Sequence, residues 1–323
     1  MGIFIISDIF ICMNSQNNIR RILLEETEPK VLNECVIAGV KLKDTIVLAK
    51  NRDRGYKAKI ELVHEIVDGV EIAYWRDTDT DWSEGMNEYG ISIVNSALST
   101  AADEKEGEKV LKQRKIKNDK TEKRVYSKDG QKIREALTKK DMRSAVKSLI
   151  EFTGSKSKWG LRGETFVSDG KDIYVIEMTS KHAPIIKKLK EDSKIVVRSN
   201  HGVYQKDAGY TTGEKRKSSV SRMELAKKHL KDAKTDMDVI NTLKQKYDDD
   251  PFLNPYRTKN MYNMHTVGQI MMNIKEKQIV IRMDNEMGEF EGINNKLPKG
   301  YSPKIKIRIE NEKTHHKGKK LPT

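Results

Sequence analysis

Cys35 lies where a short β-branched run begins, and it is one of only two cysteines in the 323-residue chain. The run over residues 35–40 and a second run that ends at Asp53 flank a short polar turn, which predicts a β-hairpin. Antiparallel pairing would bring the two ends of this hairpin together, because opposed residues lie about 5 Å apart. The thiol could then act as a nucleophile near the Asp53 carboxylate, or it could be a small buried hydrophobic group, as free cysteine often is.

A catalytic cysteine needs a base and a donor that stabilises the oxyanion. His201 or His265 could supply the base in a papain-like arrangement, although no local pattern favours either residue. Alternatively, cleavage before Cys35 would free its α-amine, whose reference pKa of about 7.7–8.0 suits a base that takes the thiol proton. The sequence has no GxSxG, Walker-type or HExxH motif and no histidines at ligand spacing, so we expect neither a metal nor another cofactor.

Most of the elements that would hold these residues are predicted as hairpins. Asp68-Gly69 between alternating apolar runs is the strongest such signal. The predicted hairpins cover residues 36–53, 60–75, 164–178 and 267–283, further strands cover 91–95, 195–197 and 305–309, and helices cover 141–152, 221–233 and 235–247. Strands mostly in hairpins, with the helices in two separate blocks, predict an α+β fold rather than βαβ winding.

The composition limits the partners and the compartment. The net charge is +14, but the lysines spread along the whole chain and aromatic residues make up only 6% of it, so we expect a solvated basic surface and no specific nucleic-acid partner. The apolar residues 1–12 are too few to span a bilayer and lack the basic start of a signal peptide, so we expect no membrane association. Two cysteines make no disulfide framework, which favours a reducing, cytoplasmic location.

Three stretches differ in composition from the rest of the chain. Residues 1–34 are polar over most of their length and are predicted to be a leader, followed by a domain of residues 35–311. Within that domain, residues 101–132 are charged and poor in apolar side chains, which predicts a solvent-exposed excursion. Residues 312–323 are predicted to be a frayed basic tail.

Several short motifs follow one another along the chain. They are Cys35 at the start of a strand, Asn51-x-Asp53 at the end of its partner, Gly85-Met86-Asn87-Glu88-x-Gly90, Ser199-Asn200-His201, Ser218-Ser219-x-Ser221-Arg222 and the hairpin 266–283. In this order and spacing they resemble the linear-amide C–N hydrolases of the N-terminal-nucleophile (Ntn) superfamily. That group includes choloylglycine hydrolases, penicillin V acylases and acyl-coenzyme A:6-aminopenicillanic acid acyltransferases. The resemblance extends from about Cys35 to Asp284 and favours a catalytic role for Cys35.

The resemblance implies an αββα sandwich of two antiparallel sheets between helical layers, and it implies a role for each site residue. Cys35 would be the nucleophile, and Asp53 would hold and orient its α-amine. Asn200 would donate its side-chain amide to the oxyanion, and Asn95, or the backbone beside it, would supply the second donor. Arg222 would favour the thiolate, as nearby cations do.

Two positions depart from the bile-salt branch of these hydrolases. Lys50 stands where that branch has an arginine, and the two residues are not interchangeable. Asn95 lies two residues earlier than the bile-salt pattern would place it. The Asn200-His201 pair and the leader before Cys35 are closer to the acyltransferase branch and to members that are processed.

The resemblance therefore implies a self-processing cysteine amidohydrolase that cleaves a linear, non-peptide amide of a small molecule through an acyl-enzyme thioester. One alternative keeps the site and changes the acceptor, so that an amine rather than water takes the acyl group. A second alternative is a catalytically inactive, basic interaction protein on the same fold. A homo-oligomer is compatible with all three readings.

Overall fold

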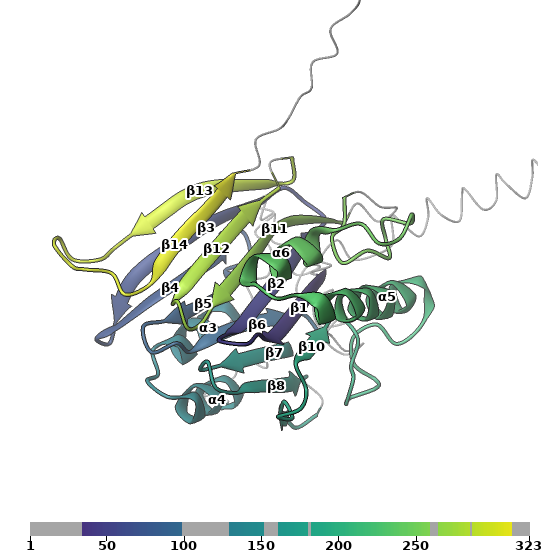
Figure 1. Ribbon diagram of the computed structural model, residues 1–323, viewed down its shortest axis with the longest axis horizontal. Helices are drawn as coiled ribbons and strands as arrows, with labels where there is room; N and C mark the ends of the chain where they lie inside the picture. The colour runs from purple at the N-terminus through teal and green to yellow at the C-terminus, as the bar shows by residue number, and fades with distance from the viewer. Residues whose placement is uncertain are drawn as a thin grey trace, which may run out of the picture. The chain divides into compact units, whose positions relative to one another are not determined.

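Two β-sheets lie face to face between helices in the described part of the chain (Figure 1). The computed structural model describes residues 34–98, 129–151, 161–179, 182–258, 264–284 and 286–311, all of them within the unit Asn33–Thr323. The predicted leader apart from Glu34, the predicted tail at 312–323 and most of the predicted excursion at 101–132 lie outside these residues. Helix α3 (Asp129–Leu137) begins within the last residues of that stretch.

The first sheet has six strands and contains Cys35. Its order is β10 (Ile195–Arg198), β1 (Glu34–Lys41), β2 (Ile46–Arg54), β11 (His265–Asn273), β12 (Gln278–Met283) and β14 (Lys306–Asn311). Neighbouring strands pair antiparallel, except that β12 and β14 pair in parallel. The hairpin predicted at Cys35 is therefore formed by β1 and β2, inside the sheet rather than at its edge.

The second sheet has eight strands. Its order is β13 (Gly288–Asn295), β3 (Ala58–Val67), β4 (Val70–Asp77), β5 (Trp82–Asn87), β6 (Ser92–Ser96), β7 (Gly163–Ser168), β8 (Ile173–Met178) and β9 (Ile185–Lys188). Only β13 and β3 pair in parallel. The predicted α+β sandwich is confirmed, and each sheet gains one parallel edge pair because β13 and β14 reach their partners through long connections rather than tight turns.

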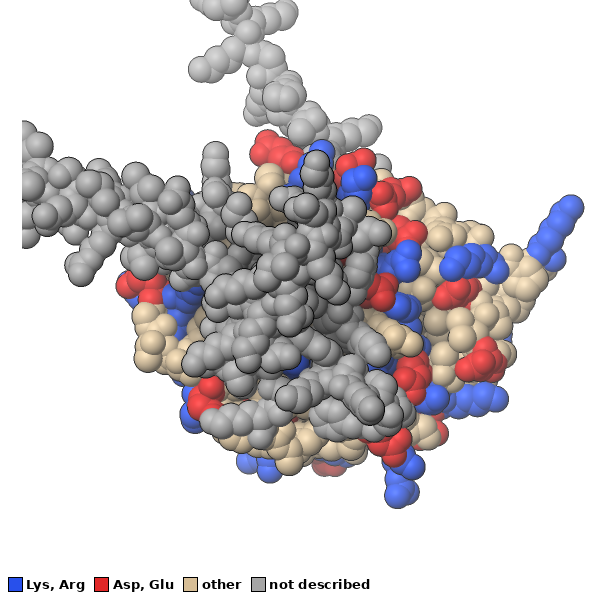
Figure 2. All heavy atoms as spheres, turned by 180° about the vertical axis from the view of Figure 1, so that it is seen from behind, with Lys and Arg blue, Asp and Glu red and all other residues tan. Residues whose placement is uncertain are grey.

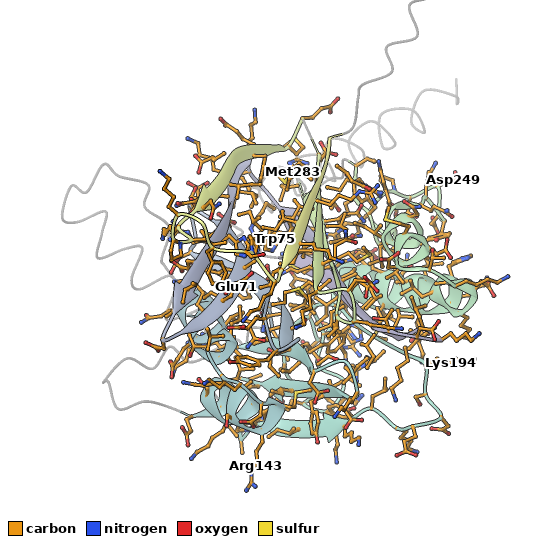
Figure 3. All side chains as sticks on the ribbon, turned by 60° about the vertical axis from the view of Figure 1, so that its left-hand side comes forward. Glu71, Trp75, Arg143, Lys194, Asp249 and Met283 are labelled. Carbon is orange, nitrogen blue, oxygen red and sulfur yellow. The ribbon has the colours of Figure 1, made fainter. Side chains whose placement is uncertain are left out.

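Three apolar cores hold the layers together. The core between the sheets includes Trp75, which Figure 3 places centrally. A second core joins the second sheet to α3 and α4 (Met142–Ile150), with Ile133 and Leu149 buried in it. The third joins the first sheet to α5 (Gly213–His229) and α6 (Asp236–Lys244), with Ala226 and Ile240 buried in it. Because successive strand residues face opposite sides, each sheet contributes to two cores.

Local signals predicted most of the element boundaries. Asp68 and Gly69 have φ angles of 51° and 75°, the left-handed values that a two-residue hairpin turn of type I′ requires. Helix α6 begins where the sequence predicted, with a capping box in which Thr235 and Asp238 exchange side-chain and backbone hydrogen bonds.

Helix α5 begins at Gly213, well before the predicted start at Ser221. Its buried side includes Ser218, Ser219 and Arg222, which bond to other parts of the chain. A helix with a polar buried face has no apolar periodicity to reveal it, so the sequence pattern marked only its second half. The short strand β9 and the edge strand β13 were also not predicted, since neither is well buried.

Gly85 offers a test of the sheet at the β4–β5 pair. A Cβ atom at this position would overlap the Ala73 carbonyl oxygen and lie 2.6 Å from the Tyr74 Cβ, both on the neighbouring strand. Gly85→Ala should therefore lower the free energy of unfolding by about 1–3 kcal/mol, measured by urea denaturation. Gly55→Ala is the control, because its Cβ would meet only the Met264 sulfur at an ordinary 3.5 Å. Equal stability of the two variants would contradict the strand pairing.

Candidate active site

Cys35 is buried near the start of β1, with 1% of its surface exposed. The antiparallel register pairs Cys35 with Arg52 and Glu34 with Asp53. Paired residues share a face of the sheet, and the neighbouring Ile37 belongs to the core between the sheets whereas Val36 belongs to the core under α5 and α6. The thiol therefore faces the second sheet, and the two carboxylates face the helices. The hairpin brings its two ends together as predicted, but Asp53 lies opposite Glu34 rather than opposite Cys35.

Arg222 of helix α5 joins the residues that the sequence singled out. Its Nη1 donates to the Cys35 carbonyl oxygen at 3.4 Å and to Asp53 Oδ2 at 3.2 Å. Its Nη2 donates to Asn200 Oδ1 at 3.0 Å and to Glu34 Oε2 at 3.0 Å. The guanidinium is fully buried, and burial followed by the nearby Arg257 holds its pKa below the ordinary value. Cys35, Asp53, Asn200 and Arg222 thus share one hydrogen-bonded network.

Asn200 follows β10 and contacts the peptide bond that precedes Cys35. The Cys35 N–H donates to Asn200 Oδ1 at 3.0 Å. The Asn200 amide nitrogen donates to Ser96 Oγ at 3.2 Å and to the Ala97 carbonyl oxygen at 3.0 Å, at the end of β6. Ser219 of α5 fixes the backbone, because the Asn200 N–H donates to its Oγ at 2.8 Å. In the full-length chain, the Asn200 amide oxygen faces the Cys35 nitrogen.

Asn95 is buried in β6, and its side chain forms a hydrogen bond within the second sheet. Its Nδ2 donates to Thr165 Oγ1 at 2.6 Å, and Asn95 shares a face of β6 with Ile93, which packs against α3 and α4. Its backbone carbonyl, in contrast, accepts from Lys50 Nζ at 2.6 Å. Of the two options predicted for the second oxyanion donor, the Asn95 side chain is thus bonded within the second sheet, and the backbone carbonyl beside it is an acceptor rather than a donor.

The carboxylate of Glu34 lies between Arg222 and two residues that the sequence did not identify, Arg257 and Tyr210. Glu34 Oε2 forms an ion pair with Arg257 Nη1 at 2.5 Å and accepts from Arg222 at 3.0 Å, while Oε1 accepts from the Tyr210 hydroxyl at 2.8 Å. We call Arg222, Arg257 and Tyr210 the carboxylate pocket. Burial raises the pKa of Glu34, but Arg257 and Arg222 outweigh it, so that this pKa lies below its ordinary value. No local sequence signal marks Arg257, which lies in the connection between α6 and β11.

Asp53, on β2, is the second carboxylate near the guanidinium groups of Arg222 and Arg257. Like charges placed opposite each other on neighbouring strands repel, and Glu34 and Asp53 are opposed in this way. Arg222 lies within hydrogen-bonding distance of both carboxylates, and Thr266 Oγ1 donates to Asp53 Oδ1 at 2.7 Å. Burial raises the pKa of Asp53 above its ordinary value, because the opposing effects of Arg257 and Arg222 compensate only in part.

A second set of buried charges lies on the thiol's side of β2, between the sheets. Lys50 and Arg52 both bond to Glu84 of β5, which also accepts from the Trp75 indole N–H. All three charged side chains have 0% exposure. Burial lowers the pKa of Lys50, although the Cys35 and Glu84 charges oppose that effect. The position that departs from the bile-salt pattern thus holds a buried lysine, paired with Glu84 on the thiol's side of the sheet.

The two histidines considered as bases occupy different positions relative to the Cys35 peptide. His201 Nδ1 is 2.8 Å from Ser219 Oγ, so a serine and Asn200 separate it from the Cys35 peptide. Burial, followed by the charge of Arg216, lowers the pKa of His201 to about 4. Its imidazole is therefore neutral at neutral pH. His265 opens β11 opposite Arg54.

Within the described ranges, no three His, Cys, Asp or Glu side chains lie close enough together to hold a metal ion. None of the described helices is both long and apolar enough to cross a membrane. Among the described residues visible in Figure 2, basic and acidic side chains are interspersed.

Comparisons with known proteins cover families, curated proteins and solved structures. No protein-family model matches the chain, and no curated protein matches it. Among solved structures, the chain is similar to penicillin V acylase from Agrobacterium tumefaciens, with 10% sequence identity and a TM-score of 0.40. The match covers 78% of this chain and 86% of that one.

Proposed function

We propose that this protein is a cysteine amidohydrolase of the Ntn type, which cleaves a linear C–N amide of a small molecule after its chain is cut between Glu34 and Cys35. The observation that carries the proposal is the buried network in which Arg222 and Asn200 contact both sides of the Cys35 peptide unit. Residues predicted from separate motifs meet there, on elements far apart in the sequence. Such convergence on the Cys35 peptide unit holds the nitrogen and the carbonyl group of the proposed nucleophile in a fixed geometry.

Cleavage of the chain must come first, because the amide nitrogen of Cys35 has no lone pair available to accept a proton. In the proposed step, the Cys35 sulfur attacks the Glu34 carbonyl carbon and the C–N bond breaks. The nitrogen leaves as the free amine and takes up the proton that the thiol gave up. Water then hydrolyses the thioester, which restores the thiol and leaves Glu34 with an α-carboxylate. Asn200 Oδ1, which accepts from the Cys35 N–H, would orient the nitrogen for this exchange.

Turnover would repeat the same chemistry on an external amide. The freed α-amine takes the thiol proton, the sulfur attacks the substrate carbonyl, and the substrate amine departs as water or another acceptor enters. Lys50 lies on the thiol's side of the sheet, and Arg222 holds the Cys35 carbonyl from the helix side. Asn200 and the backbone beside Asn95 would stabilise the oxyanion, with the Asn200 amide turning towards it once the leader has gone.

The same site could pass the acyl group to an amine, and product analysis in the presence of an added amine separates hydrolysis from transfer. An inactive interaction protein would keep the fold without the cut. The proposed enzyme needs no cofactor and no nucleic-acid partner, and its proposed location is the cytoplasm.

Intact mass of the freshly purified protein tests the proposal directly. We expect the chain that carries activity to begin at Cys35 and to react once with a thiol-directed electrophile, with loss of amide hydrolysis. Storage of a slowly cleaving preparation should increase the cut form and the activity together. A full-length chain that hydrolyses amides at the same rate as the cut chain would exclude the α-amine as base and would favour His201 or His265.

A further inference from the structure

We propose that the carboxylate pocket, which holds Glu34 before cleavage, becomes the acyl-binding pocket of the mature enzyme. Its substrates would then be amides whose acyl group carries a carboxylate at the distance found in a glutaryl group. This inference rests on the cysteine hydrolase proposed above and specifies its substrate class.

The pocket is built to bind a carboxylate. Arg222 and Arg257 are fully buried, and their guanidinium groups lie 3.0 Å and 2.5 Å from Glu34 Oε2. Tyr210 donates to the other oxygen at 2.8 Å, so both oxygens of the carboxylate are bound. The Arg257 Nη2 also donates to Ser218 Oγ at 2.8 Å, which fixes the guanidinium against helix α5. Charge-assisted hydrogen bonds of this kind are stronger and more directional than neutral ones.

Cleavage changes the charge of this pocket. Before cleavage, the carboxylates of Glu34 and Asp53 balance the guanidinium groups of Arg222 and Arg257. If Glu34 departs with the leader, Asp53 is the one carboxylate among the described residues that still pairs with both cations. A buried charge without a partner is strongly unfavourable, so the emptied pocket should bind an anion. The Cys35 α-amine, freed beside it, increases the positive charge when it is protonated.

The chemistry of maturation indicates which anion fits. After the N-to-S shift, the acyl group on the Cys35 sulfur is that of Glu34, so the first acyl-enzyme formed at this site is a glutamyl thioester. Glutarate is glutamate without its α-amino group, and a glutaryl thioester would place its carboxylate where the Glu34 side chain now lies. The rotatable bonds of that chain allow for the short displacement of the carbonyl from nitrogen to sulfur. The pocket has therefore already bound a carboxylate at the same distance from the acyl carbon as the carboxylate of a glutaryl group.

Anilides of a chromogenic amine test this preference on the wild-type chain, once intact mass shows that it begins at Cys35. The glutaric acid anilide is compared with that of glutaramic acid, which has the same shape but a carboxamide in place of the carboxylate. We expect kcat/KM to be on the order of a hundredfold higher for the glutaryl compound, because the neutral group leaves buried guanidinium charge unpaired. The shorter succinyl and longer adipoyl anilides should fall between the two.

Tyr210→Phe should lower the ratio of kcat/KM for the glutaryl anilide to that for the glutaramic anilide several-fold, because it removes one donor to the carboxylate and keeps the ring. Tyr247→Phe is the matched control and should leave the preference unchanged, since that hydroxyl donates to the Thr242 carbonyl oxygen of α6 instead.

Each other outcome excludes a different claim. Hydrolysis of the anilides without preference for the carboxylate would overturn the inference and leave the proposed function standing. A chain that hydrolyses amides while it retains Glu34 would also overturn it, because the pocket never empties. A cleaved chain that hydrolyses none of the anilides would overturn the proposed function. In that case, protection of the cleaved chain from thermal unfolding by glutarate, but not by glutaramate, decides whether the pocket takes a carboxylate.

Discussion

The Cys35→Ala variant should be neither cleaved nor active, whereas we expect the wild-type chain to be both. Alanine removes the sulfur that, in the proposed mechanism, attacks Glu34 during maturation and the substrate during turnover. Loss of a catalytic nucleophile typically lowers kcat by about a thousandfold or more, and here the uncut chain would also lack its base. Intact mass should show a full-length chain, and amide hydrolysis should fall to background.

Two further variants separate chemistry from folding. Cys12→Ala removes the other cysteine and should leave cleavage and activity unchanged. Cys35→Ser retains a nucleophile that can make the same acyl shift and should be cleaved more slowly, with low activity. Because Cys35 is buried in β1, thermal unfolding of each variant should be recorded as well. An alanine variant that folds and is still cut before residue 35 would show that cleavage does not depend on its own thiol.

Residues close together in the sequence were the ones that could be predicted. Asp68-Gly69 determines its hairpin because the turn chemistry is contained in two residues, and the β1–β2 hairpin follows from two β-branched runs. The start of α5 could not be predicted, because its buried side is polar and its partners lie on distant segments. Local propensity and apolar pattern determine an element only where its environment is apolar.

The same limit applies to the site. Cys35, Asp53, Asn200 and Arg222 were identifiable because each lies in a short motif, and the structure brings these four together. Arg257 and Tyr210 lie in no motif, and their role depends on where Glu34 is placed by the sheet. The sequence suggested that the Asp53 carboxylate lies near the Cys35 thiol, but the strand register pairs Asp53 with Glu34, one residue earlier. This difference is enough to place the Cys35 and Asp53 side chains on opposite faces of the sheet.

Buried charge between the sheets leads to the largest expected effect on stability. Glu84 is the carboxylate to which Lys50, Arg52 and the Trp75 indole all bond, and it is fully buried. Glu84→Gln keeps the shape and removes the charge, so two buried cations lose their shared partner. Breaking a buried ion pair in this way costs about 3–5 kcal/mol, and urea denaturation at neutral pH measures it. Glu276→Gln is the control, because its pair with Lys306 is exposed and should contribute less than about 1 kcal/mol.

The dependence on pH distinguishes lost charge from disturbed packing. Burial raises the pKa of Glu84, but Arg52 and Lys50 outweigh burial and hold it below the model-compound value of 4.5. A carboxyl group whose pKa is lower in the folded chain stabilises that chain above its unfolded pKa, and the contribution is lost as the pH falls through the folded pKa. The difference in unfolding free energy between wild type and Glu84→Gln should therefore be full at neutral pH and shrink below about pH 4.5. A difference that stays constant into acid would indicate packing, whereas partial recovery of stability in Glu84→Gln/Lys50→Met would show that the unpaired cation is the cause.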